Sequence, residues 1–208
     1  MTKTQCIEKV LHEKVIAIIR ANNDDQAAKM VEALHEGGIS LIEITMTVPN
    51  SVELIARLAS TMGDNLIIGA GTVMGQYAAS QCIQAGAQFI VSPVTDVPTV
   101  QYCQSQGVAI FPGALTPTEI IAAKSAGADI VKVFPCVSLG GPSYIKNLRG
   151  PFPDLPLMAT GGVSINSVMD YFNAGANCVG IGGELCDPTK THAELIDGAK
   201  KLVTLVHQ

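Results

Sequence analysis

Apolar residues gather in short continuous runs that recur along the chain and alternate with stretches of helical periodicity. The runs cover residues 15–20, 41–46, 66–71, 88–93, 108–113, 129–135, 156–162 and 178–183. Each run has the length of a strand and is apolar at nearly every position, which is typical of strands buried on both faces of a parallel sheet. The sequence therefore predicts eight buried parallel strands.

The stretches between these runs carry the periodicity and the end signals of helices. Residues 2–14 predict a short amphipathic helix ahead of the first strand. Pro49 is expected to open a helix that runs to Gly63, because proline is favoured in the first helical turn. Later helices are expected to stop at glycines just before a strand, namely Gly86, Gly107, Gly127 and Gly175.

The repeated order of strand and helix predicts the fold class. Eight parallel strands, each followed by a helix, close into a (β/α)8 TIM barrel, here with an extra N-terminal helix. An open, doubly wound sheet is the alternative, but no GxGxxG motif follows the first strand. No linker or low-complexity segment interrupts residues 1–208, so we expect a single domain.

Composition narrows the classes of function. Hydrophobic residues make up 48% of the chain and charged residues 15%, a lean surface charge that favours an oligomer. The net charge of −5 and the lack of a basic stripe argue against nucleic acid as a partner. No apolar run approaches the ~20 residues of a membrane span. Six cysteines without a CxxC pair, and no signal-like N-terminal segment, favour the cytoplasm.

Two charged residues interrupt the apolar runs and are the candidates for chemistry. Lys132 lies within residues 129–135, and Glu43 lies within residues 41–46. Because removing an ammonium group from water is costly, a buried lysine either pairs with an acid or loses its proton and becomes a nucleophile. The alternative for Lys132 is a side chain that reaches solvent. The alternative for Glu43 is a structural salt bridge to Lys132 or Arg20.

In a barrel, polar residues at the carboxyl ends of the strands line the working face. Those residues are Arg20, Glu43, Thr45, Thr72, Ser92, Lys132 and Thr160. The four histidines, His12, His35, His192 and His207, fall in helical stretches instead. Since no His, Cys or carboxylate cluster has metal-ligand spacing, we expect neither a metal cofactor nor a Ser-His-Asp triad. Cys136 is assigned no role beyond packing.

A lysine and a glutamate in one pocket suit imine chemistry on a carbonyl substrate. The neutral amine of Lys132 adds to a ketone and loses water. The resulting iminium accepts the electrons released when a neighbouring carbon–carbon bond breaks. Glu43 is expected to carry the protons that these steps require.

Several segments, in this order and spacing, resemble those of a known family. They are IEITMTVP, IIGAGTV, QFIVSP, IFPGALTPTE, VKVFP, KNLRGPFP and MATGGV. The family is that of the 2-keto-3-deoxy-6-phosphogluconate (KDPG) and 4-hydroxy-2-oxoglutarate (KHG) aldolases, and the resemblance covers nearly the whole chain. It implies a homotrimeric class I aldolase that cleaves a 2-keto-3-deoxy-6-phospho sugar acid to pyruvate and glyceraldehyde 3-phosphate. It also implies KHG as a second substrate, cleaved to pyruvate and glyoxylate.

The resemblance implies roles for single residues. The family's Schiff-base lysine falls on Lys132 and its acid/base glutamate on Glu43. Residues that match its substrate-binding positions are Thr72, Pro93 and Thr160 at the pyruvyl end and Phe134 beside the imine.

Thr47 is a departure from the family pattern that concerns the substrate carboxylate. Some members carry an arginine at this place, two residues before the proline of the segment. We expect Arg20, at the end of the neighbouring first strand, to supply a bidentate contact instead. The alternative is a surface arginine paired with Asp24 or Asp25.

Glycines follow the last two strands, where barrels often hold a phosphate group. Backbone N–H groups at Gly161, Gly162, Gly182 and Gly183, together with a helix beginning near Ser164, favour an anion there. Glu184 opposes this, at a place where some members carry a serine. We expect its side chain to point to solvent while its N–H still donates, and hence a phosphorylated substrate to be the better one.

Three other functions fit parts of the pattern. A barrel that binds a sugar phosphate without turnover predicts a protonated Lys132 locked in an ion pair. A phosphate-sugar isomerase or decarboxylase predicts an Asp-Lys network at the strand ends, which the sequence lacks. An aldolase for an unphosphorylated 2-keto acid requires the same Lys132 and Glu43 but no phosphate site.

Overall fold

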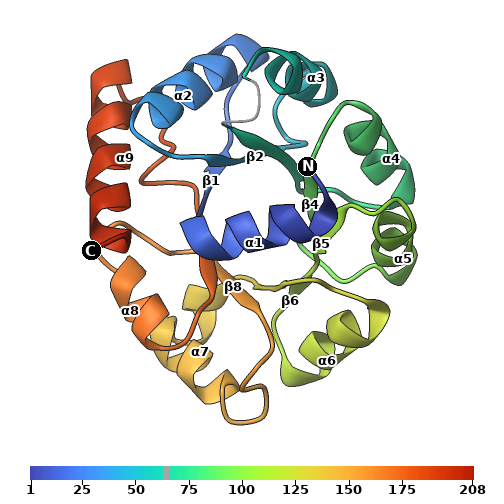
Figure 1. The fold of residues 1–208 in the computed structure, drawn as a ribbon. Coiled ribbons are helices and arrows are strands. Elements are labelled where there is room, and N and C mark those ends of the chain that lie inside the picture. The colour runs from blue at the N-terminus through green and yellow to red at the C-terminus, as the bar shows by residue number, and fades with distance from the viewer. Residues whose placement is uncertain (63–65) are drawn as a thin grey trace.

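A computed structural model describes residues 1–62 and 66–208, which form a ring of parallel strands enclosed by helices (Figure 1). The strands are β1 (Val15–Ile19), β2 (Leu41–Thr45), β3 (Ile67–Gly71), β4 (Phe89–Val91), β5 (Ala109–Phe111), β6 (Gly113–Ala114), β7 (Val131–Val133), β8 (Leu157–Thr160) and β9 (Cys178–Ile181). The helices are α1 (Lys3–Glu13), α2 (Asp24–Glu36), α3 (Ser51–Thr61), α4 (Gln76–Gln84), α5 (Val97–Ser105), α6 (Pro117–Ala126), the 3-10 helix η2 (Cys136–Leu139), α7 (Pro142–Leu148), α8 (Val168–Asn173) and α9 (His192–Val206). The alternation of strand and helix confirms the predicted barrel.

Pro112 divides the fifth predicted strand into two short pieces, β5 and β6. β4 pairs with β5 and β6 pairs with β7, so the ring of eight barrel positions closes through Pro112. Proline has no N–H group to donate to a neighbouring strand. Its carbonyl oxygen still accepts a hydrogen bond of 2.9 Å from the Lys132 N–H. The expectation of one continuous strand over 108–113 is therefore corrected.

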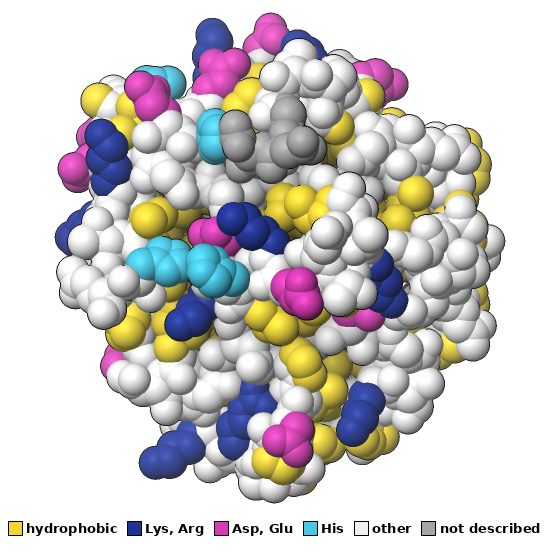
Figure 2. Space-filling model, viewed as in Figure 1, with side chains coloured by type: hydrophobic (Ala, Val, Ile, Leu, Met, Phe, Trp, Pro, Cys, Tyr) yellow, Lys and Arg dark blue, Asp and Glu magenta, His cyan; other side chains and the backbone are white. Residues whose placement is uncertain are grey.

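Helix α1 lies across the amino ends of the strands (Figure 1) and confirms the predicted extra helix. Its buried residues Cys6 and Val10 pack with inward-facing residues at the bottom of the barrel, including Ile16 and Leu41. On this closed face, charged side chains of both signs are scattered over the middle as well as the rim (Figure 2). The carboxyl ends of the strands open on the opposite face, where parallel barrels carry their sites.

The pleat of the strands decides which residues face the barrel interior. Leu41, Ile130 and Met158 belong to the interior cluster that α1 covers. Side chains two positions further along a strand point to the same side, which places Glu43 and Lys132 in the next layer of the interior. The intervening residues, such as Ile42 and Val131, belong to the larger core between strands and helices.

Two expected helix starts are wrong, and the four helix ends expected at glycines before later strands are confirmed. Helix α3 begins at Ser51, because Pro49 lies in the preceding turn; the expected end at Gly63 lies outside the described residues. Helix α8 begins at Val168 rather than near Ser164. There, the Ser164 and Ser167 side chains accept each other's backbone N–H groups at 3.2 and 3.0 Å, a local pattern that competes with helix formation. The glycines expected to end helices have the positive φ angles of left-handed caps: Gly86, Gly107, Gly127 and Gly175.

Arg149 fixes the loop that leads into β8. Its Nη1 donates to the Leu155 carbonyl oxygen at 2.7 Å, and its Nη2 donates to Asn177 Oδ1 at 2.6 Å. Asn177 Oδ1 also accepts from the Leu157 N–H at 2.9 Å. The arginine of the KNLRGPFP segment thus holds the starts of β8 and β9 together. Within residues 1–62 and 66–208, no helix combines the length and the apolar character that crossing a membrane requires.

Candidate active site

Lys132 is buried on β7, as its position in an apolar run predicts. Its side chain is 5% exposed, and Nζ lies 5.1 Å from the centroid of the Phe134 ring. Within the described residues, no carboxylate forms a salt bridge with it and no hydrogen bond to Nζ is made. No ion pair therefore accounts for this lysine, which lies in the wall of a cavity.

Glu43 lies on β2 and is completely buried. Neither of its carboxylate oxygens has a hydrogen-bond partner in the described part of the chain. Burial raises the pKa of Glu43, because desolvation penalises the charged form, while the positive charges of Lys132 and Arg20 oppose this shift. The alternative of a structural salt bridge is not what the structure shows. Glu43 is instead a buried carboxyl group without a hydrogen-bond partner among the described residues.

The neighbouring strand leaves room for this carboxyl group. Gly71 ends β3 and pairs with Thr45 of β2. A Cβ atom at Gly71 would overlap Oε1 of Glu43. Any larger residue at Gly71 of the IIGAGTV segment would therefore clash with Glu43, a constraint that the sequence alone does not reveal.

Arg20 turns toward the ends of β2 and β3. Its Nη1 donates to Thr47 Oγ1 at 3.0 Å, and its Nη2 lies 3.4 Å from Thr72 Oγ1. Thr47 Oγ1 in turn lies 2.7 Å from Thr45 Oγ1, which donates to the Ile19 carbonyl oxygen at 2.8 Å. Arg20 thus reaches the place where Thr47 departs from the family pattern.

The aspartates that were the alternative partners of Arg20 lie near another arginine. Arg57 Nη2 is 4.0 Å from Asp24 Oδ2, and Arg57 Nη1 is 3.7 Å from Asp25 Oδ1. The guanidinium of Arg20 therefore has no carboxylate partner among the described residues and is available to a substrate carboxylate.

One cavity of about 370 Å³ joins most of the predicted site residues. It is lined by Arg20, Lys132, Phe134, Thr160, Gly161, Gly162, Gly182 and Gly183, and further by Ile18, Val163, Ser164, Gly180 and Glu184. Three predicted residues are absent from this lining, and one of them is the completely buried Glu43. Pro93 lines a neighbouring cavity that shares Phe134, and Thr72 is connected through its contact with Arg20.

The side chain of Glu184, which was expected to point to solvent, forms a hydrogen bond within the chain. Its Oε2 accepts a hydrogen bond of 3.1 Å from the backbone N–H of Ile165, in the loop after β8. The two residues are 19 positions apart in the chain, so no local sequence signal indicates this contact. A carboxylate of the chain itself is therefore bound beside the glycines expected to hold a phosphate.

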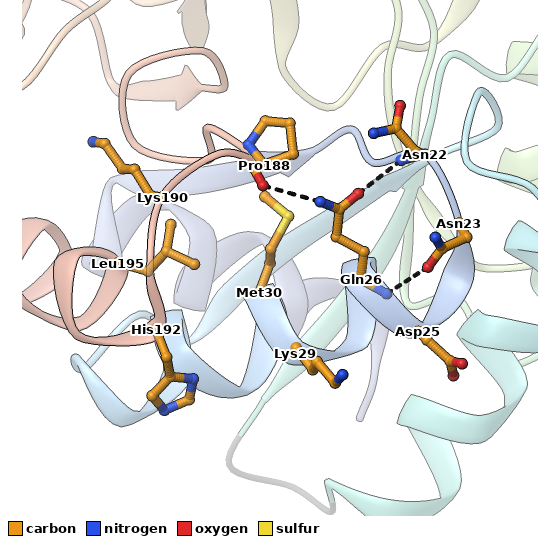
Figure 3. Close-up of a pocket in the computed structure, with 10 residues that line it drawn as sticks. All are labelled: Asn22, Asn23, Asp25, Gln26, Lys29, Met30, Pro188, Lys190, His192 and Leu195. Carbon is orange, nitrogen blue, oxygen red and sulfur yellow. Dashed lines mark hydrogen bonds between the residues drawn. The ribbon is translucent and has the colours of Figure 1, made fainter.

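A second, larger cavity of about 610 Å³ lies between α2 and the segment leading into α9 (Figure 3). Its lining contains none of the predicted site residues. Gln26 crosses this cavity and donates from Nε2 to the Pro188 carbonyl oxygen at 2.9 Å (Figure 3). This contact ties α2 to the loop that carries Glu184.

The histidines lie in or beside helices α1, α2 and α9, away from the strand ends, as expected. Within residues 1–62 and 66–208, no group of three or more His, Cys, Asp or Glu side chains is arranged to hold a metal ion.

Comparison with known proteins agrees with this arrangement. The family model described as KDPG and KHG aldolase matches residues 6–201. The chain belongs to the KDPG and KHG aldolase family. It is 34% identical over 171 residues to the 2-dehydro-3-deoxy-phosphogluconate aldolase of Treponema pallidum, a match covering 82% of this chain and 80% of that relative.

Solved structures of family members share the fold. The KDPG aldolase of Legionella pneumophila, with pyruvate captured as a covalent carbinolamine intermediate, matches with a TM-score of 0.81 and 26% identity over 96% of this chain and 95% of that one. A designed cube-shaped protein cage, made by fusing symmetric oligomeric domains, matches with a TM-score of 0.88 and 29% identity over 93% of this chain and 72% of that one.

Proposed function

We propose that this chain is a class I aldolase in which Lys132 forms the Schiff base and Glu43 transfers the protons. The observation that carries the proposal is Lys132 itself, 5% exposed and without an acidic partner in the described residues. A buried lysine without an acidic partner is placed to act as a nucleophile toward a bound carbonyl group. The carbinolamine of the Legionella relative supports the same chemistry at the corresponding step.

The first half of the reaction makes the imine. Nζ of Lys132 adds to the C2 keto group of the substrate, and the carbinolamine loses water to give an iminium. Glu43 donates the proton that the leaving water needs, which its raised pKa makes possible.

The second half breaks the carbon–carbon bond. Glu43, now a carboxylate, takes the proton of the C4 hydroxyl group. The C3–C4 bond breaks, the aldehyde leaves, and the electron pair moves to the iminium nitrogen to form an enamine. Glu43 returns its proton to C3, and water hydrolyses the imine to release pyruvate. The covalent imine supplies the electron sink, so we propose a reaction without a metal cofactor.

The proposed substrates are KDPG, cleaved to pyruvate and glyceraldehyde 3-phosphate, and KHG, cleaved to pyruvate and glyoxylate. Arg20 is proposed to bind the C1 carboxylate of the substrate in a bidentate contact. Thr160, Thr72 and Pro93 form the pyruvyl end, and Phe134 packs beside the imine. The glycines Gly161, Gly162, Gly182 and Gly183 surround the far end, toward the phosphate.

The alternative of a barrel that only binds a sugar phosphate requires Lys132 in an ion pair, and the described residues show none. The alternative of an Asp-Lys network lacks an aspartate in the cavity lining.

Pyruvate release from KDPG and from KHG tests the proposal directly. Lys132→Met should lower kcat on the order of 10⁴-fold or more, as loss of a covalent nucleophile does elsewhere. Lys146→Met, which removes an exposed lysine of α7, is the matched control and should retain wild-type turnover. Comparable turnover in both variants would exclude Lys132 as the nucleophile.

We further propose a homotrimer in the cytoplasm. Apart from Met1, the large apolar side chains exposed in the described residues lie mainly in segments that follow β3, β4 and β7. They are Met74, Tyr77, Val94, Val97, Val137 and Leu139, with Ile121 on α6. All six cysteines are buried free thiols, which supports a reducing compartment.

A further inference from the structure

Glu184 places a negative charge at the far end of the cavity that contains Lys132. The residue follows β9, lines this cavity, and also lines the adjacent one of about 540 Å³. Its Oε2 accepts from the Ile165 N–H at 3.1 Å. In parallel barrels, N–H groups of the loops after these two strands are the common donors to a phosphate group.

Two consecutive N–H groups of the β8–α8 loop already donate to side chains of the chain itself. The Ser164 N–H donates to Ser167 Oγ at 3.0 Å, and the next N–H, that of Ile165, donates to Glu184. A phosphate group entering here would have to displace the carboxylate or lie beside it with the same sign of charge. Like charges in contact disfavour binding.

The backbone around Glu184 is held in place from two sides. The Lys190 ammonium donates to the backbone carbonyl oxygen of Glu184, and Gln26 of α2 donates to the Pro188 carbonyl oxygen at 2.9 Å (Figure 3). The Cys186 N–H closes the turn on the Gly182 carbonyl oxygen at 2.8 Å. These contacts aim the Glu184 side chain at the β8–α8 loop.

We infer that Glu184 is a specificity-determining residue that lowers the preference of this enzyme for a phosphorylated aldehyde end. The end of the cavity lined by Glu184 then discriminates only weakly between a phosphate group and an uncharged hydroxyl group. An unphosphorylated 2-keto-3-deoxy sugar acid is therefore expected to be cleaved with a kcat/KM comparable to that of the phosphorylated one. This inference rests on the proposed aldolase function.

The kinetic test compares KDPG with unphosphorylated 2-keto-3-deoxygluconate. In Glu184→Gln, the ratio of kcat/KM for KDPG to that for the unphosphorylated acid should rise roughly tenfold. The reason is that the substitution removes one negative charge from a partly exposed anion site. Asp187→Asn is the matched control. It removes the same charge from the same loop, but its carboxylate binds the Thr189 N–H at 2.8 Å and does not line the Lys132 cavity.

A binding measurement separates this inference from the proposed function. Calorimetry with inorganic phosphate should show roughly tenfold tighter binding to Glu184→Gln and Glu184→Ala than to wild type, and no change for Asp187→Asn. An unchanged ratio and unchanged phosphate affinity in both Glu184 variants, or an equal rise in Asp187→Asn, would overturn the inference. Absence of turnover by wild type with either acid would instead count against the proposed function, and the phosphate affinities would still test the role of Glu184.

Discussion

Glu43 and Lys132 share the barrel interior without an ion pair or a hydrogen bond between them. Leaving a buried polar group unpaired costs about 1–3 kcal/mol, and more for a charged group. Such a cost is found where a site is arranged for a ligand rather than for stability. At the scale of single residues, the unpaired carboxyl group of Glu43 fits the proposal that its partner is the substrate.

Glu43→Gln tests the role of the carboxyl group in proton transfer. The variant should still form an imine with pyruvate but lose turnover by ~10²–10⁴-fold, the usual contribution of a general acid/base. Steady-state cleavage of KDPG and borohydride trapping measure the two steps separately. Glu36→Gln, at an exposed glutamate of α2, should behave as wild type. Turnover of Glu43→Gln within a factor of two of wild type would leave Glu43 without this role.

The raised pKa of Glu43 makes the stability of the protein depend on pH. The folded state holds the Glu43 proton more tightly than the unfolded chain does, so the stabilising effect of this proton is present below the ordinary pKa of a glutamate. It is lost as pH rises from there through the raised folded-state pKa. In Glu43→Gln this loss is absent, so the Tm of the variant minus that of wild type should increase with pH. A difference that stays constant between acidic and alkaline pH would show that Glu43 titrates as an ordinary surface glutamate.

At the scale of elements, the alternation along each strand makes much of the site predictable. Continuous apolar runs predict the strands, and the charges within two of them predict that Glu43 and Lys132 face one interior. Other features depend on contacts between distant segments. The hydrogen bond from the Ile165 N–H to Glu184 joins two loops that no local pattern connects. The break at Pro112 and the start of α8 at Val168 have local causes, but the pattern of apolar runs does not register them.

Gly71→Ala tests the fit between β3 and β2. The added methyl group overlaps Glu43 Oε1, so the carboxyl group must move. A displacement of about 1 Å at a catalytic group costs ~10²-fold in rate, and overpacking typically costs about 1–3 kcal/mol in stability. Kinetics and thermal unfolding measure the two effects. Gly150→Ala, where the new Cβ would lie at an ordinary 3.5 Å from the Asn147 carbonyl oxygen, is the control. Wild-type kcat/KM in Gly71→Ala would show that the position of Glu43 is not critical.

At the scale of the whole molecule, the surface carries few charges and keeps several large apolar side chains exposed, mainly in the segments that follow β3, β4 and β7. A monomer of this size seldom leaves such side chains exposed together without a partner. A closed cyclic assembly of identical subunits would cover them. The low charge content of the sequence predicts an oligomer, but composition does not show which apolar residues are exposed.

Multi-angle light scattering tests the assembly. The account predicts a species of three times the chain mass of 21.7 kDa at micromolar concentration. Replacing Tyr77 and Val137 together by serine should shift the distribution toward smaller species, because both side chains are exposed on the single chain. A wild-type protein that elutes as a monomer would contradict the proposed trimer.

The central claim is that Lys132 forms a covalent imine with a 2-keto acid, and trapping tests it most directly. Protein is incubated with pyruvate and sodium borohydride, then digested and mapped by mass spectrometry, with Lys132→Arg and a pyruvate-free sample as controls. The account predicts irreversible inactivation and one reduced pyruvyl group, located on Lys132 and absent from both controls. An adduct on a different lysine, or full activity with no adduct, would contradict it.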